Sequence, residues 1–258
     1  MRTKAASIAA RVPFAAMAPI ARIARITLAA AVVLAGRAAA GTARAQVAPS
    51  AAEASAYRGL HAAAWRGDTA AITRAVGDKG GDKAALEARD AHGRTPLHVA
   101  TFARQRAAVK ALLAAGADHA ALESGRYDAV TIAAVADDEE TLAILLAAGA
   151  SAKLVTSRYD GTALIAAAHL GHDGVVRQLI RAGAPLDHVN NLHWTAVIES
   201  IVLGDGGARH QATLKALLDA GASTKLADRE GRTPLALALA RGRGYAAMVK
   251  LLEDAGAR

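Results

Sequence analysis

The sequence has 258 residues, contains no cysteine and carries a formal net charge of +8 at pH 7. The absence of cysteine excludes a disulfide framework and a thiolate metal site. The excess positive charge lies in the first 45 residues, which hold seven basic residues and no acidic one. The remaining residues include 24 basic and 23 acidic ones, so their charges nearly balance. We therefore expect no nucleic acid partner, because binding phosphates requires a basic face.

Residues 1–45 have the order of a Sec-type signal peptide. Two arginines precede an uncharged run of eleven residues, 26–36, and small residues follow at positions 43 and 45. We expect cleavage between Ala45 and Gln46, with cleavage after residue 40 as the alternative. An uncleaved membrane anchor is the competing interpretation, but a helix needs about 20 residues to cross a bilayer. We therefore expect no stable membrane span after cleavage, and a periplasmic location.

The sequence also gives a prediction for the translation start and one for the segment that follows the leader. Met17 would begin a leader of 29 residues, an ordinary length for such a signal, so we hypothesise that translation begins at Met17 rather than at Met1. Residues 46–55 are rich in alanine and serine and contain a proline. They are interpreted as a short linker, and residues 56–258 as one domain.

The rest of the chain repeats itself. Gly-Ala pairs begin at residues 116, 149, 183, 221 and 256, which places them 33 to 38 residues apart. An apolar doublet such as Leu112-Leu113 precedes each pair, and a Thr-Pro-Leu opening or a weaker version of it stands further upstream. A fixed period of this length indicates a repeat architecture.

The residue choices within one repeat predict two short helices. Pro96 and Pro234 suit the first turn of a helix, where a missing N–H costs nothing, and Thr95 and Thr233 before them are plausible capping residues. The glycine of each Gly-Ala pair suits the end of the second helix. One such unit cannot bury its apolar stripe, but stacked units can. The prediction is an all-α solenoid of about six helix-turn-helix repeats with short β-turn tips.

The segment GRTPLHVA at 93–100, followed by LLAAGAD at 112–118, resembles the ankyrin repeat family. The resemblance covers about six repeats, of which the first, near 53–89, lacks the Gly-Ala ending. Residues 77–84 form a glycine-rich insertion in repeat one, and repeat five carries five extra residues around 204–210. We expect both insertions to be surface loops, where added length costs little.

The histidines and the acidic residues are the candidates for a chemical site. His61 and His98 occupy the same repeat position and are expected to bond neighbouring turn backbone rather than to bind metal. The other histidines lack the convergent spacing of a zinc site, so no metal and no cofactor is expected. Residues 137–140, all acidic, stand at the start of a second helix, where the helix dipole favours them. A cation site or a contact with a basic partner is the alternative for this run.

No catalytic constellation is present in the sequence. No serine stands in a G-x-S-x-G elbow, and the glycine-rich stretch at 77–83 lacks the order of a phosphate-binding loop. We therefore expect that the protein is not an enzyme.

The few aromatic residues indicate a binding face. Seven lie beyond the leader, and five of them fall at turn tips or at inner-helix ends, positions that line the partner-binding groove in proteins resembling ankyrins. Large aromatics beside arginines are typical binding hot spots; the alternative is that each ring covers an adjacent turn. The predicted protein-binding residues are Trp65, Arg66, Arg94, Phe102, Arg104, Arg126, Tyr127, Tyr159, His169 and Trp194.

The expected function is that of a monomeric, non-enzymatic module that binds a partner protein of the cell envelope. The family resemblance also suggests a role in envelope stress or peroxide defence, or in neutralising a toxin, and the residues do not select among these. A divergent enzyme or small-ligand protein, with a site near 204–210, and a secreted effector are the further alternatives.

Overall fold

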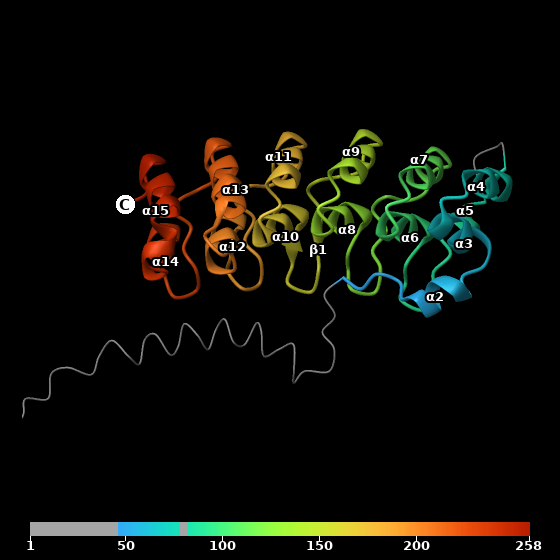
Figure 1. The fold of residues 1–258 in the computed structure, drawn as a ribbon, viewed down its shortest axis with the longest axis horizontal. Helices are drawn as coiled ribbons and strands as arrows, with labels where there is room; N and C mark the ends of the chain where they lie inside the picture. The colour runs from blue at the N-terminus through green and yellow to red at the C-terminus, as the bar shows by residue number, and fades with distance from the viewer. Residues whose placement is uncertain (1–45, 78–81) are drawn as a thin grey trace, which may run out of the picture. The chain divides into compact units, whose positions relative to one another are not determined.

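The computed structural model describes residues 46–77 and 82–258. In these residues helices pair into six hairpins that stack side by side in two rows (Figure 1). The inner row, next to the turn tips, consists of α3 (Gly59–Arg66), α6 (Pro96–Phe102), α8 (Ala129–Val135), α10 (Ala163–Leu170), α12 (Ala196–Val202) and α14 (Pro234–Ala240). The outer row consists of α4 (Thr69–Val76), α7 (Arg106–Ala114), α9 (Glu139–Ala147), α11 (Asp173–Arg181), α13 (Ala208–Asp219) and α15 (Ala246–Asp254).

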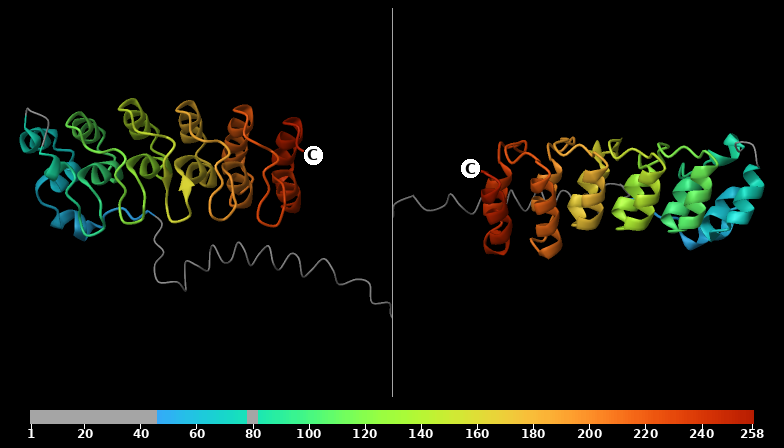
Figure 2. Two further views of the ribbon diagram at one scale, coloured as in Figure 1. Left: turned by 180° about the vertical axis from the view of Figure 1, so that it is seen from behind. Right: turned by 90° about the horizontal axis from the view of Figure 1, so that it is seen from above.

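This arrangement confirms the predicted all-α solenoid of about six repeats, and Figure 2 shows the hairpins following one another from residue 58 to the C-terminus. The predicted signal peptide and the Met17 start fall in residues 1–45, outside the described residues. Within the described part of the chain, no helix combines the length and the apolar character needed to cross a bilayer.

The inner helices begin at equivalent residues of each repeat. The side chains of Asp128, Thr162 and Thr195 each accept a hydrogen bond from the backbone N–H three residues further on. Pro96 and Pro234 lie in the first helical turn, as predicted. Because the caps satisfy N–H groups that have no partner inside the helix, each inner helix starts at a fixed place in its repeat.

The outer helices end at the predicted glycines. Gly116 has a φ of 91°, and the N–H groups of Gly116 and Ala117 donate to the carbonyls of Leu113 and Leu112, both at 3.0 Å. The same pair of bonds recurs at residues 149, 183, 221 and 256. A left-handed residue closes a helix in this way, and glycine adopts it without a Cβ clash.

The core lies between the two rows and between consecutive hairpins. Small side chains such as Ala100, Ala134 and Ala168 are fully buried on the inner helices, where they let neighbouring hairpins approach closely. One leucine of each apolar doublet is also buried: Leu112, Leu145, Leu179, Leu217 and Leu252. Since each hairpin buries its apolar stripe only against its neighbours, the stability of the domain is a property of the stack.

The predicted linker at 46–55 is wrong for the described residues, because this segment is folded against the repeats. It contains a short helix, α2 (Ala51–Ala56), which begins with a capping box between Ser50 and Glu53. Arg94 of repeat two donates to the carbonyl of Val47 at 3.1 Å, and Pro49 is buried. We call residues 46–57 the N-terminal strap.

The insertion in repeat five is only partly the surface loop that the sequence predicts: Asp205 is exposed in a non-helical segment, but the rest is held by contacts. Its last residues form the first turn of α13, which has 12 residues where α11 has nine. Gly204 and Gly206 are buried, and Tyr245 packs over them with its hydroxyl bonded to the Gly204 carbonyl. The extra turn places Arg209 Nε 3.4 Å from Asp173 Oδ1 on α11.

The insertion in repeat one ends in a short helix, α5 (Lys83–Leu86). Its N-cap residue, Asp82, is exposed.

Candidate protein-binding face

One half-exposed side chain from each of the first five inner helices lies at the same position, seven residues after the helix cap. We call this row the inner strip: Trp65, Phe102, Val135, His169 and Val202. Each is partly buried, while the small residues around them are fully buried. The next position adds exposed Arg66 and Leu170. Because adjacent inner helices contact one another along the stack, these equivalent positions form a continuous line.

The turn tips beside the strip are fixed by hydrogen bonds. Asp90 Oδ1 accepts from the backbone N–H of His92 and of Arg94, at 2.8 and 2.9 Å. Asn190 Oδ1 accepts from Leu192 and Trp194 in the same way, both at 3.0 Å. Consecutive tips are also joined through the backbone, at 2.8 to 3.0 Å: Ser124 to His92, Ser157 to Arg126 and Asn191 to Tyr159. In repeat four, β1 (Val155–Thr156) pairs with β2 (Gly161–Thr162), which confirms a β-turn tip there.

The five predicted aromatics differ in how much of each ring is exposed. Trp65 and Trp194 are half-buried and pack against the core, so part of each ring stabilises its own repeat. Tyr127 is half-buried, and burial raises the pKa of its hydroxyl. Phe102 is half-buried on the strip, and Tyr159 is 46% exposed at its tip. A partner would therefore meet Tyr159 more fully than the other four rings.

Four of the predicted cationic residues are exposed, but three of them already have partners in the chain. Arg126 lies 3.1 Å from Asp160 of the next tip, and Arg104 reaches Asp138 at 3.9 Å. His169 lies on the strip beside a buried carboxylate described below. The Arg126–Asp160 pair is exposed on both sides and contributes about 0–1 kcal/mol, so a partner can displace it at low cost. The carboxylates beside Arg104 and His169 are buried. Arg66 is the fourth of these cationic residues and is also exposed.

Arg94 does not belong to the binding face, and its prediction as a partner contact is wrong. The residue is only 1% exposed. Its guanidinium donates to Asp90 Oδ2 through Nε and to Glu53 Oε1 through Nη2, both at 2.6 Å. Hydrogen bonds from Ser50 lower the pKa of Glu53 to about 2, and Arg94 adds to the effect. Arg94 therefore holds the N-terminal strap to repeat two.

His61 and His98 are structural, as expected. The His61 ring nitrogen Nε2 lies 2.9 Å from the Arg94 carbonyl. His98 accepts from the Thr95 N–H through Nδ1 at 3.1 Å, which leaves Nε2–H to donate to the Ala121 carbonyl at 3.0 Å. Burial lowers the pKa of His98 to about 4. Both rings join consecutive repeats.

The acidic run at 137–140 starts helix α9, as predicted. Asp138 is the N-cap and accepts from the Thr141 N–H at 3.2 Å. Burial opposes its ionisation, but hydrogen bonds from Thr141 and Arg106 still lower its pKa. Arg209 of the lengthened α13 donates to Asp137 at 2.9 Å. The run thus bonds to arginines of the same chain, and no group of three metal-ligating side chains occurs among residues 46–77 and 82–258.

Sequence reasoning missed a buried carboxylate on the inner face. Glu199 of α12 is 4% exposed. Its Oε1 accepts from Asn190 Nδ2 at 3.0 Å, and its Oε2 lies 3.3 Å from Nδ1 of His169 on α10. That separation is within ion-pair range, but Oε2 forms no hydrogen bond of adequate geometry. The available signal was a glutamate at a position that is apolar in the other inner helices.

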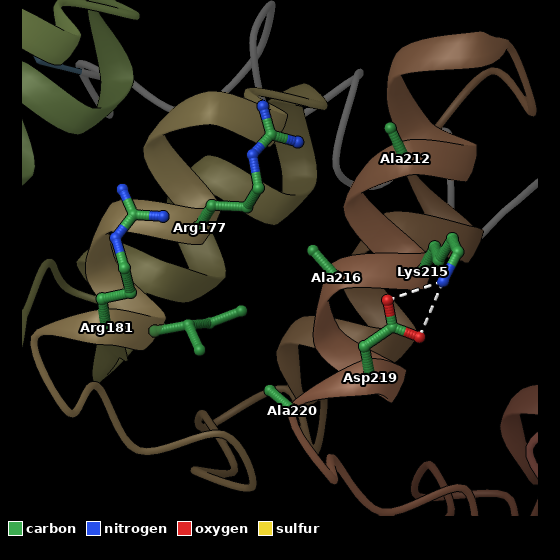
Figure 3. A pocket seen from close by; sticks show the side chains of 8 residues that line it. Arg177, Arg181, Ala212, Lys215, Ala216, Asp219 and Ala220 are labelled. Atoms are coloured by element: carbon green, nitrogen blue, oxygen red, sulfur yellow. Dashed lines mark hydrogen bonds and ion pairs between the residues drawn. The ribbon is translucent and has the colours of Figure 1, made fainter.

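A cleft of about 420 Å³ opens between the outer helices α11 and α13 (Figure 3). It exists because α13 presents the small side chains of Ala212, Ala216 and Ala220 to its neighbour. Arg177 and Arg181 border it on one side, and Lys215 on the other is paired with Asp219 at 2.6 Å. The cleft is shallow and lies on the outer row.

Six stacked hairpins with fixed tips and a half-exposed inner strip define a helical repeat solenoid, a class of protein that typically binds through an extended face. A family model described as ankyrin repeats (3 copies) matches residues 130–223, and one described as ankyrin repeat matches residues 92–124. The chain belongs to the ankyrin repeat family, whose members are typically non-catalytic modules for protein–protein interaction.

Relatives from several organisms share this architecture. The ankyrin repeat protein YahD of Escherichia coli K12 is 37% identical over 169 residues, which are 65% of this chain and 83% of the relative. Human ankyrin repeat and SOCS box protein 16 is 32% identical over 68% of this chain and 39% of its own length. The crystal structure of an ankyrin repeat domain from Acinetobacter baumannii AYE superposes with a TM-score of 0.70 at 43% identity, and covers 77% of this chain and 98% of that one.

Proposed function

We propose that this protein is a non-enzymatic binding module of the bacterial periplasm, which holds a partner protein along its inner strip and turn tips. The observation that carries the proposal is the inner strip itself. Five equivalent positions on consecutive inner helices place partly exposed side chains in one line, while the core positions around them are filled by alanine, valine and leucine. Aromatic and arginine side chains such as Phe102 and Arg66 supply the residue types that dominate binding energy at interfaces.

The rigidity of the face supports the same function. Hydrogen bonds inside each tip and between consecutive tips hold the loops in place before any partner arrives. A surface that is already ordered loses little conformational entropy on binding, so modest contacts from several repeats can add to a useful affinity.

The proposed location rests on the leader sequence. Residues 1–45 have the basic, apolar and small-residue order of a cleavable signal. Envelope stress, peroxide defence and toxin neutralisation are the processes that the family resemblance suggests, and the partner's identity would select among them.

Site-specific photo-crosslinking in living cells tests the binding face. A photoreactive amino acid is placed on the inner face, at Arg66 or Leu170, and on the exposed outer face, at Arg74 or Lys110. We expect one protein to be crosslinked from the inner positions and not from the outer ones. Substitutions Arg66→Ala and Phe102→Ala should weaken that crosslink, and Arg74→Ala should not. Crosslinks from the outer positions alone would refute the assigned face.

Fractionation tests the location separately. We expect the protein in the periplasmic fraction, with a mature N-terminus at Gln46. Removal of residues 1–45 should leave the protein in the cytoplasm. Recovery of the full-length protein in the cytoplasm, with its leader intact, would contradict the proposed export without bearing on the binding face.

A further inference from the structure

Glu199 is a buried carboxylate that the fold itself satisfies only in part. Its side chain is 6% exposed, one oxygen accepts from Asn190, and the other has no hydrogen-bond partner. A buried polar atom without a partner costs free energy and is rare in folded proteins. A residue kept in this state therefore calls for a role that core packing does not supply.

Comparison with the other repeats shows that packing does not require a carboxylate at this position. The equivalent residues, four after each inner-helix cap, are Ala62, Val99, Ile132, Ala166 and Leu237. The tip residue that bonds Glu199 is also altered. Asn190 stands where repeats two and six have Asp90 and Asp228, and only an amide can accept from the turn and donate to Glu199 at once. Repeat five thus differs from the other repeats at two positions that bond to each other, Glu199 and Asn190.

The free oxygen faces the inner strip. His169, the strip residue of the preceding repeat, is the one cationic or titratable base within 4.0 Å of Glu199 among the described residues. Its side chain is 41% exposed, and its ring forms no hydrogen bond of adequate geometry there. The ring lies beside Glu199 Oε2, and no hydrogen bond holds it in that place.

We propose that Glu199 is a recognition site for a cationic side chain, a lysine or arginine, of the partner segment that lies along the inner strip. This inference rests on the proposed function. The His169 ring moves aside, and the incoming ammonium or guanidinium donates to Oε2. Val135 and Val202, the neighbouring strip residues, offer apolar contact to the aliphatic stem.

The chemistry disfavours an acidic or an apolar occupant of this position. An acidic side chain would place two carboxylates together, and an apolar one would leave Oε2 buried without a donor. A cation supplies both the missing hydrogen bond and the opposite charge, and such charge-assisted bonds are the strongest of their kind. The site therefore adds specificity to a strip whose other members, such as Phe102 and Val202, are largely apolar.

A selection from a random peptide library tests the inference with the purified protein as bait. Selected peptides are kept when the Arg66→Ala/Phe102→Ala variant fails to bind them, since these contact the inner strip. Their affinities are then measured for the wild type, for Glu199→Gln and for Glu253→Gln, a control that alters an exposed glutamate on α15. Each peptide is also made with its lysine or arginine replaced by norleucine. Thermal unfolding of every variant verifies that it is folded.

We expect lysine or arginine to be enriched at one position of the peptides, and Glu199→Gln to weaken them by about tenfold or more. Glu253→Gln should leave binding unchanged, and the norleucine peptides should no longer distinguish Glu199→Gln from the wild type. Strip-binding peptides that are insensitive to Glu199→Gln would overturn this inference and leave the proposed function standing. Failure to select any strip-binding peptide would count against both.

Discussion

Asn190 donates its side-chain amide to the buried carboxylate of Glu199, with Nδ2 lying 3.0 Å from Oε1. The same asparagine orders its turn through Oδ1, the task that Asp90 and Asp228 perform in other repeats. An aspartate at position 190 would keep the turn but place two carboxylates in contact. We expect Asn190→Asp to lower the free energy of unfolding by about 2 kcal/mol, measured by urea unfolding at neutral pH.

The partner substitution Glu199→Leu should have the opposite effect. Leucine occupies the equivalent position in repeat six, as Leu237, where it is 7% exposed. Replacing a whole buried ion pair by apolar side chains is often neutral or stabilising by roughly 1–4 kcal/mol. Leucine at position 199 removes the buried charge but leaves the Asn190 amide without its acceptor, so we expect the net gain to be at the low end of that range. In the Glu199→Leu background, Asn190→Asp should cost much less than in the wild type. Equal costs in the two backgrounds would show that the residues are not coupled.

Arg94 and Arg232 allow a matched comparison of a covered and an uncovered arginine. Each follows an Asp-x-x-Gly tip, and each donates through Nε to its aspartate, at 2.6 and 2.7 Å. The strap covers Arg94, whose side chain is 2% exposed, whereas that of Arg232 is 36% exposed.

We expect Arg94→Ala to destabilise the protein by about 3 kcal/mol, because it leaves Asp90 and Glu53 without their buried partner. Arg232→Ala should cost less, about 1–2 kcal/mol, because it removes a partner from one buried carboxylate, Asp228, and releases no strap. Chemical unfolding of both variants gives the comparison, and limited proteolysis should cut the strap of the Arg94→Ala variant first. Equal losses of stability in the two variants would refute the structural role assigned to the strap.

The sequence was sufficient for the repeat architecture because the relevant residues act locally. Pro96 and Gly116 mark helix ends through their own backbone preferences, and their spacing alone gives the period. The role of Arg94 was not predictable in this way. Its partner Glu53 stands 41 positions earlier, in a segment whose composition resembles a linker.

The binding face was predictable only as a set of positions. The repeat register predicted positions with some exposure for Phe102 and Tyr159, but it could not show that Trp65 and Trp194 also pack against the core. Glu199 is apparent in the sequence only when all inner helices are aligned. Its pairing with Asn190 and its position beside His169 follow from the packing of repeat five against repeat four.

His98 makes stability depend on pH. Burial lowers its pKa to about 4, against an ordinary value of 6.5. Between these values the unfolded chain binds a proton that the folded chain does not, so stability falls as pH is lowered through this window. Within this window, His98 changes the free energy of unfolding by at most about 1.4 kcal/mol per pH unit. We expect His98→Gln to be less stable than the wild type at neutral pH, with a gap that narrows towards pH 4 in urea unfolding. A gap that stays constant across the window would contradict this assignment.

His193 occupies a strained backbone position where two other tips have glycine. Its φ is 63°, and the equivalent residues Gly93 and Gly231 have φ values of 70° and 75°. A side chain in this left-handed region costs roughly 1 kcal/mol, which glycine avoids. We expect His193→Gly to raise the free energy of unfolding by about 0.5–1 kcal/mol. Gly231→Ala is the reverse control, since an added Cβ meets no atom within 4 Å and its cost of about 1 kcal/mol comes from the backbone alone. If His193→Gly destabilises the protein while Gly231→Ala behaves as expected, the imidazole makes a stabilising contact that outweighs the backbone strain.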